Sequence, residues 1–440
     1  MKKTFSLLLM LSLLLCSLVA CGSNDTLLDP DDPVTLTMWH TYGEQAESPM
    51  NQQIEEFNQT VGKEKGIVIN VTNTSSATYI GQKLLDAQAN KAGALDMPDL
   101  FFCHASNARD LGVANLLDWK DVFSENELNA YVRDFIDDGM TDDALSVLPV
   151  SKSTHLLFVA GDVFDSFAAE TGVSYDDLST WDGFFEVAEK YYVWSGGSPF
   201  AAIDYLTRCV ELNAISKGAA DFYTENGWYD TTNQILMDSF RQFASSIAKG
   251  HIVVSDLYAN TQMMTGQVIA GIGSSASILY YNDRITYPDN TSIDMDLHIL
   301  TLPQAGNGTK NYATQAGVGL CAYKTTDQKA EAAKIFAAWL NEENRNLDFV
   351  AETGYMPVLN SSFNKVYDYD KFRSDAYRDL YKTLAETKKT CILLPEPNMS
   401  GYWNKVYELY DSIRMLQKNA SSENFEAITD EIIKHFTMAN

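Results

Sequence analysis

Side chains that could recognise a polar solute follow the strands that the sequence predicts. They are carboxylate, imidazole, amide and phenol groups: Glu44, His104, Asn107, Asp204 and Tyr205. Because such groups donate and accept hydrogen bonds, together they suit noncovalent capture of a molecule that carries hydroxyls. Asp204 suits the N-terminal cap of a helix equally well.

The same residues offer no specific catalytic site. A glycoside hydrolase uses two carboxylates, but among 59 Asp and Glu residues some pair is always available. Ser153 lies near His155, yet the GxSxG motif of serine hydrolases is absent. No CxxC or Cys/His spacing typical of a metal site occurs. A binding protein is therefore favoured over a hydrolase.

Hydrophobic periodicity predicts the elements that position these side chains. Apolar residues alternate over 34–38 and 67–71, and 100–103 is a short apolar run, so three strands are expected. Ser48 followed by Pro49 predicts the start of a helix after the first strand. Strand, helix, strand, helix, strand is typical of a mostly parallel sheet, whose ligands gather beyond the carboxyl ends of its strands.

A second α/β pattern begins at residues 148–158, where small hydroxyl side chains and Lys152 precede an apolar strand. Thr180 before Trp181 predicts the start of a helix in this second pattern. Further predicted elements are a strand at 268–272 and helices at 325–340, 403–416 and 425–436. With 440 residues the chain suits an α/β fold of two domains.

Charge limits the possible partners. The formal net charge is −27, whereas nucleic acid and anionic membranes attract clustered Lys and Arg. Neither is expected as a partner.

The N-terminus predicts export. Lys2 and Lys3 precede an apolar run over 5–15, too short to span a bilayer and typical of a secretory signal. The run leads to Leu18-Val19-Ala20-Cys21, which resembles the lipobox of bacterial lipoproteins. The resemblance implies a signal peptide over 1–20, diacylglycerol on the sulfur of Cys21 and a flexible tether over 21–33. An ordinary signal peptide cut after Ala20 is the alternative.

Four further cysteines remain in the mature chain: Cys103, Cys209, Cys321 and Cys391. They lie far apart in the sequence and mostly among apolar neighbours, so we expect buried free thiols. Disulfides stay open as an alternative, because an exported protein meets an oxidising environment.

Several segments resemble one family in the order in which they occur. Besides the lipobox, they are Leu36-Thr37-Met38-Trp39-His40, Thr180-Trp181-Asp182-Gly183-Phe184 and Thr353-Gly354-Tyr355-Met356-Pro357. Together they resemble the extracellular solute-binding proteins of ABC importers, family 1. Residues 225–230 and 397–403 also resemble segments of its maltodextrin-binding members. The resemblance covers nearly all of the mature chain.

The resemblance implies a two-lobed α/β fold, the periplasmic-binding-protein-like fold of type II. Each lobe would hold a mixed, mostly parallel sheet flanked by helices, with solute bound in the cleft between the lobes. The chain would cross between lobes near 149–154, 300–303 and 355–358. The implied lobes are 34–150 plus 302–354 and 151–301 plus 355–440.

Carried over position by position, the resemblance implies cleft contacts at Tyr79, Ser153, Ser274, Ser275, Gly317, Tyr355 and Trp403. Trp403 matches a tryptophan that stacks on sugar, and an aromatic face suits the C–H face of a sugar ring. At the same place glycerol-3-phosphate binders have an arginine that holds the phosphate, which this chain lacks. Cys103 also departs from the pattern of the family, because it stands where the maltose binder has a cleft tryptophan.

The implied function is capture of a carbohydrate, an oligosaccharide in particular, and its delivery unchanged to an ABC permease. The resemblance implies no cofactor and no metal, and attachment to the membrane only through the N-terminal diacylglycerol. We expect a monomer on the extracellular face of the bacterial cell membrane. The alternatives are a binder of glycerol-3-phosphate or a related phosphodiester, and a lipoprotein glycoside hydrolase.

Overall fold

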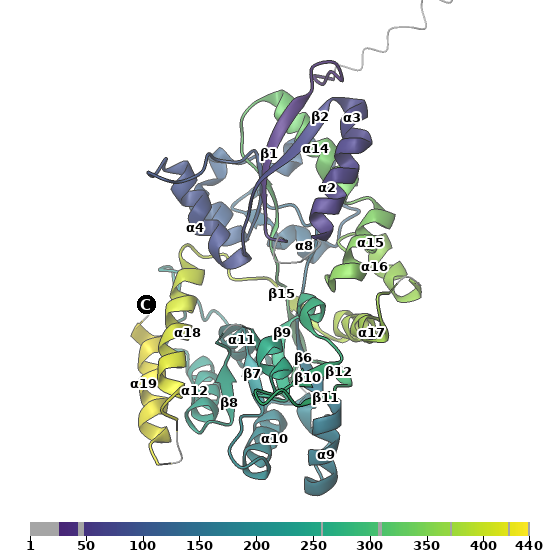
Figure 1. Cartoon of the computed structure of the whole chain (residues 1–440). Helices are drawn as coiled ribbons and strands as arrows, with labels where there is room; N and C mark the ends of the chain where they lie inside the picture. Colours follow the sequence, from purple (N-terminus) through teal and green to yellow (C-terminus); the bar gives the residue numbers. More distant parts are fainter. Residues whose placement is uncertain are drawn as a thin grey trace, which may run out of the picture.

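The structure is a computed structural model, and it describes residues 26–42, 48–256, 258–306, 310–369, 372–420 and 423–438. Cys21, the signal peptide and Glu44 lie outside these residues. Within them, no helix has both the length and the apolar character needed to cross a membrane. Two sheets organise the fold, one in the upper and one in the lower half of Figure 1.

The first sheet has the strand order β14-β3-β1-β2. Its strands are β1 (Val34–His40), β2 (Ile67–Thr74), β3 (Leu100–Cys103) and β14 (Gly319–Ala322). β2 and β3 pair in parallel with β1, as the sequence predicts, whereas β14 enters from far along the chain and runs antiparallel to β3. The helices that accompany it are α2 (Pro49–Gln59), α3 (Val61–Lys65), α4 (Ala77–Gln88), α5 (Ala105–Leu111) and α14 (Asp327–Leu340).

Local hydrogen bonds fix the predicted helix starts. The hydroxyl of Ser48 accepts the N–H of Asn51 at 3.4 Å, and Pro49 occupies the first helical position, where no N–H is needed. In the second half of the molecule, the hydroxyl of Thr180 accepts the N–H of Gly183 at 3.1 Å. Both predicted caps are confirmed.

The second sheet has the order β12-β6-β9-β7-β8. Its strands are β6 (His155–Ala160), β7 (Ala201–Ile203), β8 (Ile252–Val254), β9 (Ala270–Ser274) and β12 (Leu297–Thr301). β7 pairs in parallel with β8 and β9, but β6 runs antiparallel to both β9 and β12. This sheet is therefore less parallel than the pattern predicts, and β6 begins at the edge where its neighbours end.

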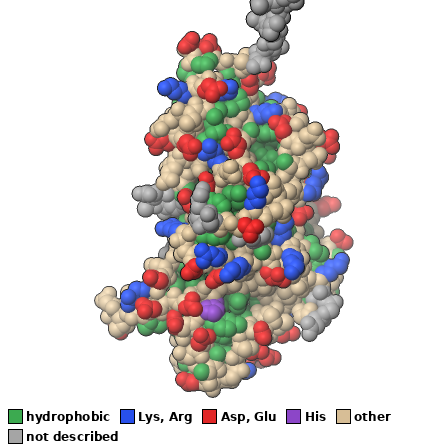
Figure 2. All heavy atoms as spheres, turned by 90° about the vertical axis from the view of Figure 1, so that its right-hand side faces the viewer, with side chains coloured by type: hydrophobic (Ala, Val, Ile, Leu, Met, Phe, Trp, Pro, Cys, Tyr) green, Lys and Arg blue, Asp and Glu red, His purple; other side chains and the backbone are tan. Residues whose placement is uncertain are grey.

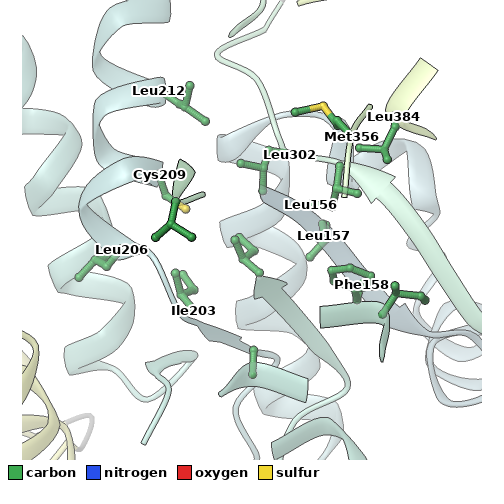
Figure 3. Close-up of a cluster of buried hydrophobic side chains, with 14 of the residues drawn as sticks. Leu156, Leu157, Phe158, Ile203, Leu206, Cys209, Leu212, Leu302, Met356 and Leu384 are labelled. Atoms are coloured by element: carbon green, nitrogen blue, oxygen red, sulfur yellow. The ribbon is translucent and has the colours of Figure 1, made fainter. Parts of the chain in front are cut away.

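Helices and short elements surround the second sheet. They are α9 (Gly161–Thr171), η2 (Tyr175–Ser179), α10 (Trp181–Trp194), α11 (Leu206–Ser216), α12 (Gln234–Ala248), α13 (Ala259–Met264), η3 (Ser275–Tyr280), β10 (Arg284–Thr286), β11 (Ser292–Asp294), α18 (Tyr402–Gln417) and α19 (Phe425–Met438). Figure 3 shows side chains of β6, β7 and α11 in one apolar cluster, where Leu156, Leu157 and Phe158 are fully buried. This packing fixes the sheet edge that β6 opens.

The remaining elements cover the first sheet and the region between the sheets. They are η1 (Val113–Asn115), α6 (Trp119–Val122), α7 (Glu125–Leu128), α8 (Arg133–Asp138), β4 (Met140–Thr141), β5 (Ala144–Leu145), β13 (Tyr312–Thr314), α15 (Glu343–Thr353), α16 (Asn360–Lys365), η4 (Val366–Asp368), α17 (Asp375–Thr390) and β15 (Ile392–Leu394). β13 pairs in parallel with β15 between the two halves of Figure 1.

Three chain segments meet between the sheets. Ser153 forms an antiparallel bridge with Ala316, and Lys152 forms another with Met356. The chain leaves the second sheet after Thr301 and joins the first at Gly319. The three connections therefore lie side by side, in the arrangement that a hinge between two bodies requires.

Part of the predicted tether packs on the fold. Thr26 and Leu27 donate hydrogen bonds to the carboxylate of Glu331 on α14, and Leu28 is buried. The tether is thus shorter than the composition of 21–33 predicts, because apolar Leu28 is buried in the hydrophobic core. Elsewhere Figure 2 shows acidic and basic side chains interspersed over one face of the molecule.

Candidate functional site

Residues 394–400, here called the cleft segment, lead from β15 to α18 and contact residues of the first sheet's half. The hydroxyl of Ser400 donates to the carboxylate of Asp110 at 2.6 Å, at the end of α5. The amide of Asn398 donates to the backbone oxygen of Met140 at 3.1 Å and accepts from Arg109 at 3.3 Å. The cleft segment therefore bridges the two halves of the molecule.

Glu396 of the cleft segment contacts the first sheet's half through both carboxylate oxygens. Its Oε2 lies 2.7 Å from Nδ1 of His104, which precedes α5, and its Oε1 accepts the N–H of Gly317 at 3.3 Å. Burial alone would raise the pKa of Glu396, but the charge and hydrogen bond of His104, with the charges of Lys152 and Arg208, hold that pKa at about 2. Glu396 is thus an ionised carboxylate between the halves.

The cations around Glu396 are bonded to the protein itself. Lys152 forms an ion pair with Asp138 and donates to the backbone oxygen of Gly317 at 3.3 Å. Arg208 on α11 forms an ion pair with Glu211 and donates to the backbone oxygens of Leu394 and Pro395, at 3.1 and 2.8 Å. These two side chains hold the cleft segment in place and leave little cationic capacity for a solute anion.

Trp403 lies in the first turn of α18 and faces the first sheet's half. Its ring centroid is 5.3 Å from that of His104 and 5.9 Å from that of Tyr407, on which it stacks. The side chain is 9% exposed, and its indole N–H has no hydrogen-bond partner within the described part of the chain. A buried donor without a partner is costly, so this N–H suits an incoming acceptor.

A small cavity separates Trp403 from α4 and α5. Its volume is about 20 Å³, and its polar lining includes Gln82, Ser106, Asn107 and Asp110. This space holds about one water molecule, whereas pockets for small molecules have roughly 300–1,000 Å³. The cavity is therefore too small for a sugar ring while α18 lies this close to α5, an arrangement called closed here.

His155 opens the facing edge of the second sheet. Its ring stacks on Tyr205 with centroids 3.9 Å apart, it is 2% exposed, and neither ring nitrogen has a partner among the described residues. Burial, with a smaller effect of the Arg208 charge, lowers the pKa of His155 to about 3 against the opposing charge of Glu396. His155 is therefore neutral at physiological pH.

Asp204 lies at the same edge of the second sheet and bonds to groups inside the protein. Its Oδ1 accepts the N–H of Ala259 at 2.7 Å, at the start of α13, and a hydrogen bond from the hydroxyl of Ser255. Burial raises the pKa of Asp204 to about 7, while these two bonds and the charge of Arg414 oppose the rise. Asp204 does not cap the helix that follows it, because Tyr205 is the N-cap of α11 and no side chain caps that helix. It instead binds the first N–H of α13, far along the chain.

A separate cavity of about 460 Å³ lies around α7 and α8. Phe123, Leu128, Tyr131 and Ile136 give it apolar walls. None of the predicted site residues lines it, so it is distinct from the region around Trp403.

The sequence matches the family model of the bacterial extracellular solute-binding proteins over residues 52–375. The chain belongs to the bacterial extracellular solute-binding proteins. No curated protein matches it.

Solved structures share the fold of this solute-binding protein at low identity. The cyclic α-maltosyl-1,6-maltose binding protein of Arthrobacter globiformis has a TM-score of 0.68 at 14% identity, over 92% of this chain and 99% of that one. A substrate-binding protein of Listeria monocytogenes in complex with cycloalternan has a TM-score of 0.68 at 15% identity, over 92% and 99%. UgpB of Mycobacterium tuberculosis with glycerophosphocholine has a TM-score of 0.70 at 14% identity, over 92% and 98%. The two-lobed fold is thereby confirmed.

The structure of this solute-binding protein brings part of the predicted site together. His104, Asn107, Gly317 and Trp403 all contact Glu396, the small cavity or each other. Gly317 has a φ of 107°, which a side chain would strain, so glycine lets its N–H reach Glu396.

Other predicted residues lie at the connections between the sheets. Ser153 is 3% exposed and exchanges two backbone hydrogen bonds of 2.9 Å with Ala316. Tyr355 is half-buried, with its ring centroid 6.0 Å from that of Tyr42. Both residues lie close to the bridges between the connecting segments, so a change in the angle between the lobes would change their surroundings.

Three predicted residues have other local roles or greater exposure. Tyr79 in α4 is 67% exposed. Ser274 caps η3 by accepting the N–H of Ala276 at 3.2 Å, and Ser275 is fully buried behind it. Ser274 thus begins a short 3₁₀ helix, in which its hydroxyl satisfies a backbone donor rather than facing open space.

Two tryptophans belong to the core. The indole N–H of Trp228 donates to the backbone oxygen of Phe436 at 2.8 Å, and the side chain is fully buried. Trp39 is 1% exposed and donates to Thr72 at 3.0 Å.

Sequence reasoning missed the charged residues around the cleft segment. Glu396 stands one residue before the segment 397–403 that carries the resemblance, between Pro395 and Pro397, and those prolines were the available signal of a fixed, extended carboxylate. The pairing of Lys152 with Asp138 had no such signal, because a lysine in a strand-like segment usually reaches solvent.

Proposed function

We propose that this solute-binding protein captures a neutral carbohydrate, an oligosaccharide in particular, between its two lobes and delivers it unchanged to an ABC permease. In this proposal it acts as a monomer, held at the extracellular face of the cell membrane by diacylglycerol on Cys21. The lobes are 34–150 with 302–354 and 151–301 with 355–440.

The observation that carries the proposal is the surroundings of Trp403. Its aromatic ring and its unpartnered indole N–H lie across a small cavity from Ser106 and Asn107. When the lobes open, this surface offers an aromatic platform on one side and hydroxyl and amide groups on the other. A sugar ring needs both, because its C–H face is apolar and its rim carries hydroxyls.

Charge supports a neutral ligand. Lys152 and Arg208 are already bonded to Asp138, Glu211 and backbone oxygens, and Glu396 adds an ionised carboxylate. The whole chain carries a net charge of −27. A phosphate ester would enter this region without a free cation to replace its hydration.

The ligands of the structural neighbours support the same choice. Two of them are described with the cyclic oligosaccharides cycloalternan and cyclic α-maltosyl-1,6-maltose. Another is described with glycerophosphocholine, so a phosphodiester remains the second candidate within the same importer class. A lipoprotein glycoside hydrolase is the third, and no catalytic motif favours it.

Calorimetric titration separates the candidates. The purified protein is titrated in parallel with linear and cyclic maltodextrins, glycerol-3-phosphate and glycerophosphocholine. We expect binding of an oligosaccharide and weak or absent binding of both phosphates. Binding of a phosphate alone would replace the carbohydrate by the second candidate.

Prolonged incubation of the protein with the sugar tests whether the protein leaves the sugar unhydrolysed. We expect the oligosaccharide to be recovered intact by chromatography. Hydrolysis at enzymatic rates, abolished by Glu396→Gln, would establish a hydrolase instead.

A further inference from the structure

Two of the four cysteines in the described chain lie side by side in the first sheet. Cys103 ends β3 and Cys321 lies in β14, and their Sγ atoms are 3.5 Å apart although 218 residues separate them in sequence. In the antiparallel ladder Cys103 faces Gly319 and Cys321 faces Phe101, so the two cysteines are diagonal neighbours. Diagonal neighbours lie farther apart than directly opposite residues, but here both cysteine side chains turn toward each other and bring their sulfur atoms into contact.

The surroundings of the pair are apolar and closed. Both cysteines are fully buried in a cluster with Trp39, Ile80 and Leu111. Burial raises the pKa of the Cys321 thiol far above its usual range, and the neighbouring Cys103 raises it further. Once this sheet has formed, neither sulfur is available to a reagent in solution.

We infer that Cys103 and Cys321 form a disulfide bond in the exported protein. Members of this family are extracellular, and thiols outside the cytoplasm meet oxidants. Each thiol gives up its proton, and together the sulfurs give two electrons to a small-molecule or protein disulfide, which leaves as two thiols. Because the folded pair is closed to solvent, the bond forms while β14 is docking on β3.

The cross-link would tie together two distant passages of the chain. β3 belongs to the first passage through this sheet, and β14 returns to it after the second sheet is complete. A bond that closes a loop of this length strongly restricts the unfolded chain. It would also fix the strand that ends next to His104, whose imidazole binds Glu396 in the site.

The other two cysteines serve as internal controls. Cys209 is fully buried in α11, and Cys391 is half-buried before β15, where its sulfur lies 3.6 Å from the hydroxyl of Thr390. Among the described residues, Cys103 and Cys321 are the pair of cysteines in hydrogen-bond contact. Cys209 and Cys391 should therefore remain thiols under conditions that oxidise the sheet pair.

Peptide mapping tests the bond directly. The full chain is produced by export, or refolded in a glutathione and glutathione-disulfide buffer, then alkylated in denaturant without reductant and digested. We expect one linked peptide pair containing Cys103 and Cys321, with Cys209 and Cys391 alkylated. Alkylation of Cys103 and Cys321 in the folded, oxidised preparation would overturn the inference.

Thermal melting provides a second readout. Unfolding and refolding in reductant should lower the Tm of the natural protein by about 5 °C or more, given the length of the closed loop. Cys103→Ser and Cys321→Ser should each lose this dependence on reductant, whereas the matched control Cys209→Ser should keep it. Equal Tm values with and without reductant in the natural protein would contradict the bond. Peptide mapping of the natural protein decides whether the disulfide forms, even if a serine variant fails to fold. This mapping requires no bound ligand.

Discussion

The two sheets present a histidine each at the edges that face one another, and the two side chains have opposite surroundings. His104, after β3, lies 2.7 Å from the carboxylate of Glu396. His155, at the start of β6, is stacked on Tyr205 and has no hydrogen-bond partner among the described residues. The first edge therefore provides charged and polar contacts to the cleft segment, while the second provides aromatic surface with unsatisfied donors and acceptors.

This difference gives the two lobes different roles at the cleft. Polar groups of the first lobe hold the closed arrangement through Glu396 and Ser400. In the function proposed above, aromatic groups of the second lobe, above all Trp403, are the ones that a sugar covers. If the division is correct, changes on the first side should alter the pH dependence and closure, and changes on the second should alter affinity.

The largest expected effect concerns His155. Its pKa in the folded protein is about 3 against 6.5 in the unfolded chain, so the unfolded chain binds the proton more readily between these values. Stability is therefore lost as the pH falls from 6.5 to 3, by on the order of 5 kcal/mol in total. His155→Phe keeps the stacking on Tyr205 and removes the titration, so its urea midpoint should fall less between pH 7 and pH 4.

A second histidine stacked on a tyrosine supplies the control. His298 stacks on Tyr175 with centroids 4.7 Å apart, but 37% of its side chain is exposed. His298→Phe should keep the acid dependence of the natural protein. If the two variants had the same pH profile, burial of His155 would not be the cause of the acid dependence.

The next effect belongs to Glu396. Its pKa is about 2 in the fold and 4.5 as a free side chain, so its contribution is complete above pH 4.5 and is lost as the pH falls toward 2. The loss is about 3 kcal/mol. Glu396→Gln should remove this part of the acid transition, measured by urea unfolding at pH 5, 4 and 3. Glu386→Gln, at a side chain that is 56% exposed, should change nothing.

Trp403→Ala is expected to weaken carbohydrate binding by more than about 2 kcal/mol, roughly thirtyfold, because it removes the aromatic platform. The fold should survive, since Tyr402, Val406 and Tyr410 provide the buried face of α18. Titration and melting of the unliganded variant separate the two roles. A large fall in Tm with unchanged affinity would mean that Trp403 serves packing.

Trp228→Phe is the matched control for this substitution. Trp228 is fully buried, and its N–H bonds the backbone oxygen of Phe436. This variant should lose stability through the missing hydrogen bond while binding carbohydrate with unchanged intrinsic affinity. Together the two tryptophans distinguish loss of a binding surface from loss of packing.

The sequence predicted features that depend on local chemistry. Ser48 and Thr180 cap helices because a hydroxyl next to a helix start has its N–H partners a few residues away. The antiparallel placement of β6 was missed, since strand pairing depends on residues far along the chain. For the same reason the pair of His104 and Glu396, 292 residues apart, could not be read from either segment.

The smallest expected effect is that of a substitution at Tyr79, an aromatic residue on the polar, first-lobe side of the cleft. The resemblance implies that Tyr79 contacts solute, but in the closed structure it is 67% exposed at the start of α4. A residue at the rim of a binding surface usually contributes little, so Tyr79→Ala should reduce carbohydrate affinity by about 0.5–1 kcal/mol, roughly two- to fivefold. Its Tm should be unchanged, because little packing is removed. Titration beside Trp403→Ala gives the ratio of the two losses. A loss at Tyr79 as large as that at Trp403 would show that the first lobe supplies an aromatic platform of its own, and the division between a polar and an aromatic side of the cleft would be wrong.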